Sequence, residues 1–373
     1  MQISALKENF KNENRVALTP DTIKLFQRLG LEVLIEDGAG NNSGYPNDLY
    51  EANGAKIVSR DQCLKANICL CVKIPNDNDL QQLNENTVLI GILNPYENKK
   101  YFNTLNEKKI ISCCMELIPR ISRAQSMDVL SSQANLAGYR SVIDAAEQFG
   151  KAFPMMMTAA GRVNPAKVMV LGVGVAGLQA IATAKRLGAV VSATDVRSAT
   201  KEQVESLGGK FVMVEDEEST NAETEGGYAK EMSDEYKQKQ AKLIAETIAK
   251  QDIVICTALI PGKKAPVLIS QEMVESMASG SVVVDLAVEA GGNCPLSKEG
   301  EVVDHGGVKI VGYANVPGRV AKDASALYAK NIFNFLSLII NKDDKKINFN
   351  WEDEIVNAVT LTHEGKLRLE QFN

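Results

Sequence analysis

One stretch, residues 167–195, constrains the fold of this chain more than any other. It opens with KVMVL at residues 167–171, an apolar run of strand length, and continues with the glycine-rich turn GVGVAG at residues 172–177. A helical pattern follows, and a second apolar run at residues 189–193 leads to Asp195. A strand, a glycine turn, a helix, a strand and an acidic residue form the order that a dinucleotide-binding fold requires.

Each residue type in this stretch has a physical reason. Gly172 allows the tight turn, Gly174 lets the backbone approach a pyrophosphate, and Gly177 lets the helix lie close to the sheet. The Asp195 carboxylate would accept hydrogen bonds from the adenosine-ribose hydroxyls, which favours NAD(H) over NADP(H). Arg197 works against that preference, because a nearby arginine can accommodate a 2′-phosphate. Glycine turns also serve ordinary strand–helix packing, but the flanking elements and the spacing of the acid together predict a bound dinucleotide.

Composition narrows the class of protein. The 373 residues suffice for two domains, and a net charge of −6 predicts no nucleic-acid partner and no direct membrane-surface binding. The first residues lack the apolar core of a signal peptide, and the apolar residues 332–340 are too few to span a bilayer, so we expect a soluble chain. The seven cysteines and two histidines show no zinc spacing, which predicts buried reduced thiols and no metal site.

Residues 1–135 are expected to form a first α/β domain. Apolar runs of strand length recur at residues 32–36, 68–72, 88–93 and 110–115. They are separated by helical or loop stretches, and this alternation predicts a mostly parallel sheet. A long amphipathic helix that ends near Gly150 is expected to bridge the first domain to the second.

Residues 136–334 are expected to form a second, NAD(H)-binding Rossmann domain with a sheet of about six strands. Its acidic stretch, residues 215–234, has no clear periodicity and is either a solvated loop or a flap that closes over the cofactor. A helix at residues 321–340 is expected to cross back, so that residues 335–373 complete the first domain. The predicted fold class is α/β, with two Rossmann-like domains whose parallel sheets are flanked by helices and joined by long crossing helices.

The segment between the two domains carries the most specific motif, which reads PRISRAQSMDVLSS at residues 119–132. Further motifs are NLAGYR at residues 135–140, TALIPGK at residues 257–263, DLA at residues 285–287 and GGNC at residues 291–294. With the glycine turn, they resemble the NAD(H)-binding alpha component (domain I, short form) of proton-translocating NAD(P) transhydrogenase. The resemblance covers about residues 1–340, and the chain is also similar to alanine dehydrogenase, which shares the two-domain fold.

The resemblance implies an oxidoreductase and translocase, Si/Re-specific, that is active only with partner subunits. It implies direct hydride transfer between NADH on this chain and NADP⁺ on a separate NADP(H)-binding beta component, and a membrane-spanning component that couples the transfer to proton translocation. It also implies a homodimer that is cytoplasmic and peripheral on the inner face of the cell membrane through its partners. The short type carries no membrane helices, and the implied cofactor set contains no metal.

Hydride transfer between two nicotinamides needs no general acid or base, but it needs the two C4 atoms held about 3–3.5 Å apart with water excluded. The motif at residues 119–132 suits that task. Arg120 and Asp128 can pair and orient ribose and carboxamide groups, Gln125 offers both a donor and an acceptor, and Ser131 offers a hydroxyl. Without the resemblance, a capping box and a surface salt bridge would explain the same residues.

The residues that the resemblance implies fall into two sets. The catalytic residues are expected to be Arg120, Gln125, Asp128 and Ser131. The residues expected to bind the cofactor are Arg120, Gln125, Ser131, Gly172, Gly174, Val175, Gly177, Asp195, Val196, Arg197, Gly227, Tyr228, Gln240 and Leu259.

An amino-acid dehydrogenase of the alanine type is the first alternative function. Arg15 and Lys73 align with the substrate-carboxylate arginine and the catalytic lysine of that family, which also needs a histidine beyond the lysine. Residues 91–97 read GILNPYE, and the two histidines lie elsewhere, His305 in an expected loop and His363 near the C-terminus. Reducing an imine or a ketone requires a proton donor near pH 7, so this absence argues against a self-contained dehydrogenase. Arg15 and Lys73 are then expected to pair with local carboxylates.

The second alternative is a non-enzymatic NAD sensor or scaffold that signals through its shape. The sequence contains no appended module that would carry such a signal.

Overall fold

The computed structural model describes residues 1–214, 233–259, 262–341 and 343–372. The chain divides into two compact units, of which unit 1 comprises Met1–Gln133 and Pro317–Asn373 and unit 2 comprises Ala134–Val316. The return to unit 1 starts earlier than the residue 335 expected from the sequence. The reason is that helix α12 (Ala321–Ile339) buries Tyr328, Ile332 and Phe335 in the core of unit 1.

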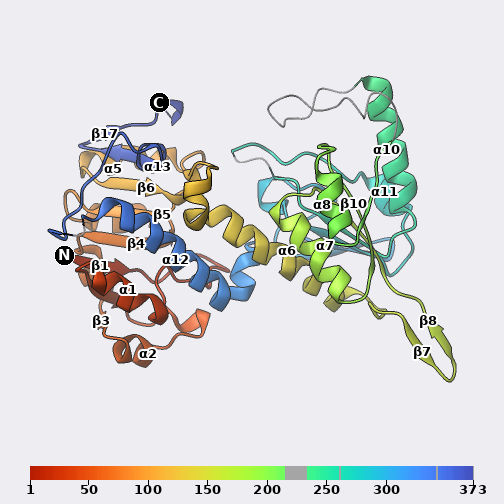
Figure 1. Ribbon diagram of the computed structural model, residues 1–373, viewed down its shortest axis with the longest axis horizontal. Coiled ribbons are helices and arrows are strands. Elements are labelled where there is room, and N and C mark those ends of the chain that lie inside the picture. Colours follow the sequence, from red (N-terminus) through yellow and green to blue (C-terminus); the bar gives the residue numbers. More distant parts are fainter. Residues whose placement is uncertain (215–232, 260–261, 342, 373) are drawn as a thin grey trace. The chain divides into compact units, whose positions relative to one another are not determined.

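Unit 1 is built on a sheet whose described strands have the order β17-β16-β6-β5-β4-β1-β2-β3 (Figure 1). The six strands from β3 to β6 are parallel and have the order 3-2-1-4-5-6 of a doubly wound dinucleotide fold. β16 and β17 extend the sheet with antiparallel pairing. The strands are β1 (Gln2–Ala5), β2 (Glu32–Glu36), β3 (Lys56–Val58), β4 (Ile68–Lys73), β5 (Val88–Ile92), β6 (Ile111–Cys114), β16 (Thr360–His363) and β17 (Lys366–Leu367).

Helices cover both faces of this sheet, because its strands are apolar on both sides. In β4, Ile68 and Leu70 point into a core shared with α1 and α12, whereas Cys69 and Cys71 point into a second core shared with α3, α4 and α5. The short central strand β1 was not predicted. The α-helices of unit 1 other than α12 are α1 (Ile23–Arg28), α2 (Asn47–Ala52), α3 (Arg60–Leu64), α4 (Asp77–Gln82), α5 (Phe102–Glu107) and α13 (Glu354–Val359).

Unit 2 has a second sheet, and its described strands have the order β11-β10-β9-β12-β13-β15-β14. All neighbours pair in parallel except the edge strand β14, so the α/β class with two largely parallel sheets is confirmed. The strands are β9 (Lys167–Leu171), β10 (Val190–Thr194), β11 (Lys210–Phe211), β12 (Ile253–Cys256), β13 (Val282–Asp285), β14 (Val302–His305) and β15 (Val308–Val311). The helices are α7 (Val175–Arg186), α8 (Thr200–Ser206), α10 (Asp234–Ile248) and α11 (Gln271–Glu275).

The strand order of unit 2 reverses between β9 and β12. From β9 the chain moves to β10 and β11 on one side and then returns to β12 on the other side. Ligands of open α/β sheets bind at the carboxyl ends of the strands at such a reversal. The topology therefore places the candidate site of unit 2 where Gly172 and Thr257 follow β9 and β12.

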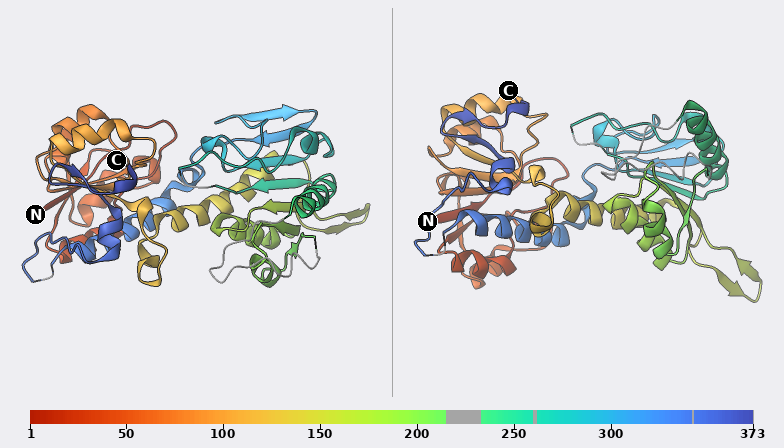
Figure 2. Two further views of the ribbon diagram at one scale, coloured as in Figure 1. Left: turned by 90° about the horizontal axis from the view of Figure 1, so that it is seen from above. Right: turned by 45° about the horizontal axis from the view of Figure 1, so that its top comes forward.

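Helix α6 (Val129–Gln148) begins in unit 1 and continues in unit 2. Three other features of unit 2 differ from the sequence-based expectation. α7 begins at Val175 rather than at residue 178, because Gly174 is its N-cap. His305 ends the strand β14 instead of lying in a loop, since residues 304–307 close a β14–β15 hairpin. Strands β7 (Met156–Thr158) and β8 (Gly161–Val163) form a hairpin that was not predicted, and it projects from the rest of unit 2 (Figures 1 and 2).

Within the stretches of chain that the structure describes, no helix combines the length and the apolar character needed to cross a bilayer.

Candidate functional site

The glycine turn of unit 2 is built by close backbone packing. Gly172 has a φ of +96°, which an L side chain rarely adopts. A Cβ on Gly177 would lie 2.0 Å from the carbonyl oxygen of Gly172, so only glycine lets α7 start against the turn. Gly174 has nothing within 4 Å of its Cβ position. The first turn of α7 therefore offers open backbone N–H groups, an arrangement that suits a diphosphate.

Asp195 closes this turn from the end of β10. Its Oδ2 accepts a hydrogen bond from the Val173 N–H at 2.7 Å, and its Oδ1 accepts one from the Arg197 N–H at 2.9 Å. The Arg197 guanidinium adds Nε to Oδ1 at 2.8 Å and Nη2 to Oδ2 at 3.0 Å. Burial by itself would raise the pKa of Asp195, but the hydrogen bonds from Arg197 and Val173 outweigh it and lower that pKa. The carboxylate is therefore ionised beside the turn, and Arg197 lies over it.

The remaining cofactor-binding candidates of unit 2 differ in their surroundings. Val175, Val196 and Leu259 are exposed, with exposed fractions of 40%, 85% and 58%. Gln240 is engaged within the protein, because its Oε1 accepts from the Val214 N–H at 2.7 Å and its Nε2 donates to Thr194 and Val212. Its amide thus holds the chain after β10 and β11 in place. Gly227 and Tyr228, the expected flap residues, lie outside the described residues.

Two residues that sequence reasoning gave no role hold the neighbouring loop. The Thr257 hydroxyl donates to the Gly172 carbonyl at 2.9 Å and so ties β12 to the glycine turn. Asn293 is fully buried, and its amide donates to the carbonyls of Ala258 and Pro266 and accepts from the Ala258 N–H. The motifs TALIPGK and GGNC contained this signal, because a buried asparagine needs partners for its whole amide.

The candidate catalytic motif lies in unit 1, in the 3₁₀-helix η5 (Ser122–Met127) and the first turn of α6. Asp128 caps α6: its Oδ1 accepts from the Ser131 N–H at 2.9 Å and its Oδ2 accepts from the Ser131 hydroxyl at 2.5 Å. Gln125 and Arg120 are exposed. Among the described residues, neither a hydrogen bond nor an ion pair joins Arg120 to Asp128, so the expected pairing of these two is wrong for this structure. The reason is that Ser131 already occupies both oxygens of the Asp128 carboxylate.

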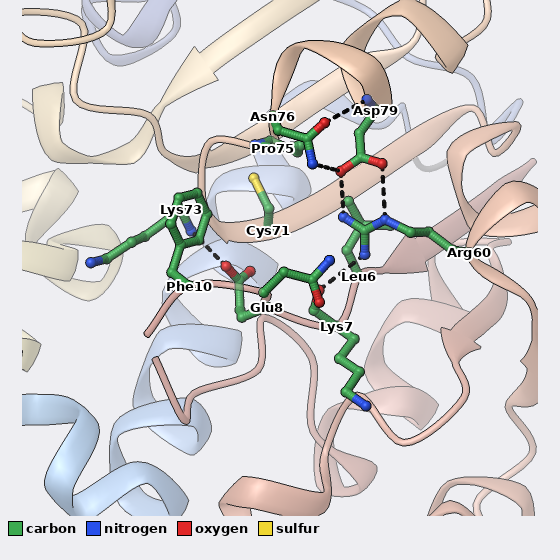
Figure 3. Close-up of a pocket in the computed structure, with 11 residues that line it drawn as sticks. Leu6, Lys7, Glu8, Phe10, Arg60, Cys71, Lys73, Pro75, Asn76 and Asp79 are labelled. Atoms are coloured by element: carbon green, nitrogen blue, oxygen red, sulfur yellow. Dashed lines mark hydrogen bonds and ion pairs between the residues drawn. The ribbon is translucent and has the colours of Figure 1, made fainter. Parts of the chain in front are cut away.

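The dehydrogenase-type residues of unit 1 surround a cavity of about 170 Å³. Lys73, Phe10 and Glu8 lie on one side of it, and Arg60 lies on the other, bonded to Asp79 (Figure 3). The lining residues include no histidine.

Arg15 and Lys73 have different surroundings. Arg15 is buried and pairs with Glu13 at 2.7 Å, as expected, and it also donates to the Gln133 Oε1 at 2.8 Å. Lys73 was expected to pair with a carboxylate too. Its ammonium instead lies 5.7 Å from the centre of the Phe10 ring, because the nearby Glu8 carboxyl accepts from the backbone N–H groups of Val72 and Lys73.

Replacing Glu8 by glutamine should remove a pH dependence of stability. Burial raises the pKa of Glu8 from its ordinary 4.5 to about 8, so the unfolded chain loses this proton at lower pH than the folded one. The free energy of unfolding therefore falls as pH rises from 4.5 to about 8, by up to about 1.4 kcal/mol per pH unit. Glutamine stays neutral, so Glu8→Gln should raise the thermal midpoint relative to the unmodified protein more at pH 8 than at pH 5.

The measurement is thermal unfolding followed by circular dichroism at both pH values. Glu51→Gln, which removes an exposed carboxylate from α2, is the matched control and should show no such difference. An equal effect of Glu8→Gln at both pH values would contradict the assignment.

Metal-binding side chains do not gather in the described residues: no group of three or more His, Cys, Asp or Glu residues there could hold an ion. The seven cysteines are buried and free.

The chain is similar over nearly its whole length to known proteins. The family described as alanine dehydrogenase/PNT matches with its N-terminal domain at residues 4–137 and with its C-terminal domain at residues 141–370. The first portion of the NAD(P) transhydrogenase alpha subunit of Rhodospirillum rubrum, which is a chain of its own, is 54% identical, over 98% of this chain and 97% of that protein. The crystal structure of transhydrogenase from Sinorhizobium meliloti is 50% identical, has a TM-score of 0.91, and the match covers 98% of this chain and 100% of that one. Alanine dehydrogenase 1 of Staphylococcus aureus is 30% identical, over 92% of this chain and 88% of that protein.

Proposed function

The chain belongs to the alanine dehydrogenase/PNT family, and we propose that it is the NAD(H)-binding component, the first portion of the alpha subunit, of an NAD(P) transhydrogenase. The observation that carries this proposal is the 54% identity to the R. rubrum subunit over nearly its full length, against 30% to the alanine dehydrogenase. The glycine turn of unit 2, with the ionised Asp195 beside it, supports the binding of NAD(H). The cavity lined by Glu8 and Lys73 includes no histidine to supply the proton that an alanine-type dehydrogenase needs.

In this function the residues of the chain bind and orient, and the bound NAD(H) supplies or receives the hydride. The start of α7 would hold the diphosphate, and Asp195 would accept from the adenosine-ribose hydroxyls. Arg120, Gln125 and Ser131 would orient the nicotinamide half. Asp128 acts on Ser131, since the two are hydrogen-bonded in the first turn of α6. No proton needs to be gained or lost by these groups in a direct transfer.

The R. rubrum relative is named as one portion of a divided subunit, which supports the presence of partner subunits. We propose that the hydride passes directly to NADP⁺ on a separate NADP(H)-binding component, and that a membrane-spanning component couples the transfer to proton translocation. This chain would then lie at the cytoplasmic face of a membrane through its partners.

A reconstitution experiment tests the function. Single-turnover transfer between NADH and NADP⁺ should occur when this chain is combined with an NADP(H)-binding partner component, and not with either component alone. Robust turnover of alanine or pyruvate with NAD(H) by the isolated chain would favour the dehydrogenase alternative instead. Nucleotide binding with neither activity would favour a sensor.

Replacing Asp195 by alanine should weaken NADH binding by about tenfold or more, because a hydrogen bond to a charged group contributes about 1.5–3 kcal/mol. The change also frees the Arg197 guanidinium, which forks onto Asp195 in the unmodified protein and could then meet a 2′-phosphate. The preference for NADH over NADPH should therefore narrow. Calorimetric titration with both nucleotides measures this, with Glu202→Gln on the exposed side of α8 as the charge-matched control. Equal affinities of the unmodified protein for NADH and NADPH would refute the role of Asp195.

The β7–β8 hairpin supports the proposal of a homodimer. Met155, Met156 and Met157 are exposed at 50%, 41% and 69%, although methionine is usually a core residue. A two-stranded hairpin with an apolar, exposed surface is only marginally stable in water by itself. A second copy of this chain that covered the hairpin would remove this surface from water.

Replacing Met155, Met156 and Met157 by serine should convert a dimer into a monomer, because the apolar contact would be lost. Sedimentation velocity at low micromolar concentration measures the state. Val267→Ser removes one apolar side chain, 60% exposed, from another region of unit 2 and should leave the dimer intact. A monomeric unmodified protein, or a triple variant that stays dimeric, would contradict the assignment.

A further inference from the structure

The carbonyl of Ser126 is held by two side chains from a single helix. Asn331 and Asn334 lie three residues apart on α12, so their side chains share one face of that helix. The Asn331 Nδ2 donates to the Ser126 oxygen at 2.8 Å, and the Asn334 Nδ2 donates to the same oxygen at 2.9 Å. The two bonds use both lone pairs of the carbonyl and fix the orientation of the peptide that follows Gln125.

The clamp has a cost that the fold retains. Asn331 is 5% exposed, and its Oδ1 is buried without a hydrogen-bond partner among the described residues. An unsatisfied buried acceptor destabilises a folded protein, and an apolar side chain would avoid it. The amide at this position is therefore explained by the donor that it supplies to Ser126.

The geometry of η5 shows what the clamp orients. A 3₁₀-helix has three residues per turn, so residues three apart lie on the same side. Ala124 and Met127 are buried in the core of unit 1 and form one side. Ser126 lies on a second side, three residues after Arg123. Gln125 lies on the third side, in line with Asp128.

Arg123 supplies a second anchor on the side of Ser126. Its Nη1 and Nη2 bond to the two carboxylate oxygens of Asp353 at 2.7 and 3.0 Å. Asp353 in turn caps α13 by accepting from the Ile355 N–H at 2.9 Å. With two of its three sides fixed, η5 has little freedom to rotate, and the side with Gln125 is held in one orientation.

We infer that Asn331 and Asn334 are positioning residues for hydride transfer, and that they act through the Ser126 carbonyl on Gln125. The inference rests on the proposed function, in which Gln125 orients the nicotinamide. Direct transfer is steeply sensitive to the placement of the reacting carbons, so a small rotation of η5 slows it without loss of the nucleotide.

Asn334→Asp tests the inference with the smallest change of shape. Asn334 is only partly buried, so the variant should fold, and it replaces an N–H donor by an oxygen that repels the Ser126 carbonyl. In the reconstituted complex the single-turnover rate should fall about tenfold. The dissociation constant for NADH and the thermal midpoint should stay close to those of the unmodified protein. Lys330→Gln makes the same change of charge at an exposed position of α12 and should leave the rate unchanged.

A double variant separates positioning from a general structural effect. If Asn334 acts through Gln125, the rate of Gln125→Asn combined with Asn334→Asp should be close to that of Gln125→Asn alone, since coupled residues are not additive. Hydrogen exchange of a peptide that spans residues 119–130 should also be faster in Asn334→Asp than in Lys330→Gln.

Three outcomes would overturn the inference while leaving the proposed function in place. They are normal transfer in Asn334→Asp, fully additive losses in the double variant, and unchanged hydrogen exchange of the peptide. A failure of the proposed function looks different, because the unmodified complex would then transfer no hydride at all.

Discussion

Replacing Gly177 by alanine should raise the dissociation constant for NADH by about a hundredfold, because overpacking at a close backbone contact costs about 1–3 kcal/mol or more. The Cβ of the alanine would lie 2.0 Å from the carbonyl oxygen of Gly172. That oxygen belongs to the backbone and cannot rotate away like the end of a flexible side chain. The first turn of α7 must move, and its N–H groups leave the position that suits a diphosphate.

Two other glycines are matched controls. Gly174→Ala should weaken NADH binding while leaving the thermal midpoint unchanged, because its Cβ would meet no protein atom within 4 Å but would occupy the open space over the start of α7. Gly150→Ala should affect neither property, since that position is also open and lies after α6. Calorimetric titration and thermal unfolding measure the two effects. Tight NADH binding by Gly177→Ala with a normal thermal midpoint would refute the role of the turn.

Replacing Gln125 by asparagine should slow hydride transfer by about tenfold to a hundredfold, because a small misplacement of the reacting carbons is costly. NADH affinity should change little, since most of the binding comes from the adenosine and diphosphate half. Gln125 is exposed, so the shorter side chain should not disturb the fold. The amide carries no charge and is neither an acid nor a base at neutral pH, so the loss should be the same at every pH between about 6 and 8.

Single-turnover transfer in the complex with the NADP(H)-binding partner measures this loss. Asp128→Asn should behave similarly, because asparagine still caps α6 but offers only one oxygen to Ser131. Arg120→Ala should also slow the transfer, with some loss of NADH affinity. Gln203→Asn, the same change at an exposed position of α8, should have no effect. Normal transfer in Gln125→Asn would mean that the site is wrong.

Local sequence patterns were sufficient for the elements of the dinucleotide unit. The apolar run at residues 167–171 is strand β9, and the expected helix at residues 234–250 is α10 (Asp234–Ile248). These elements could be predicted because the signal for each, an apolar period or a glycine at a turn, lies within a few neighbouring residues. The family was predicted in the same way, from contiguous motifs such as PRISRAQSMD.

Elements with weak local signals were missed. The four residues of β1 (Gln2–Ala5) are too few to show a period, yet they form the centre of the sheet of unit 1. The β7–β8 hairpin was missed because its methionines are typical of a core, although they are exposed here. Composition near a residue does not determine what covers that residue.

The sequence by itself determined the α/β class, the glycine turn with its acid, and the residue types of the motif at residues 119–132. The tertiary structure decided which partners those residues have. Asp128 bonds to Ser131 instead of Arg120, Arg15 reaches Gln133, and the Ser126 carbonyl is held by Asn331, 205 residues further along the chain. A hydrogen bond requires two groups within about 3 Å of each other, and only the folded chain brings residues so distant in sequence to that separation.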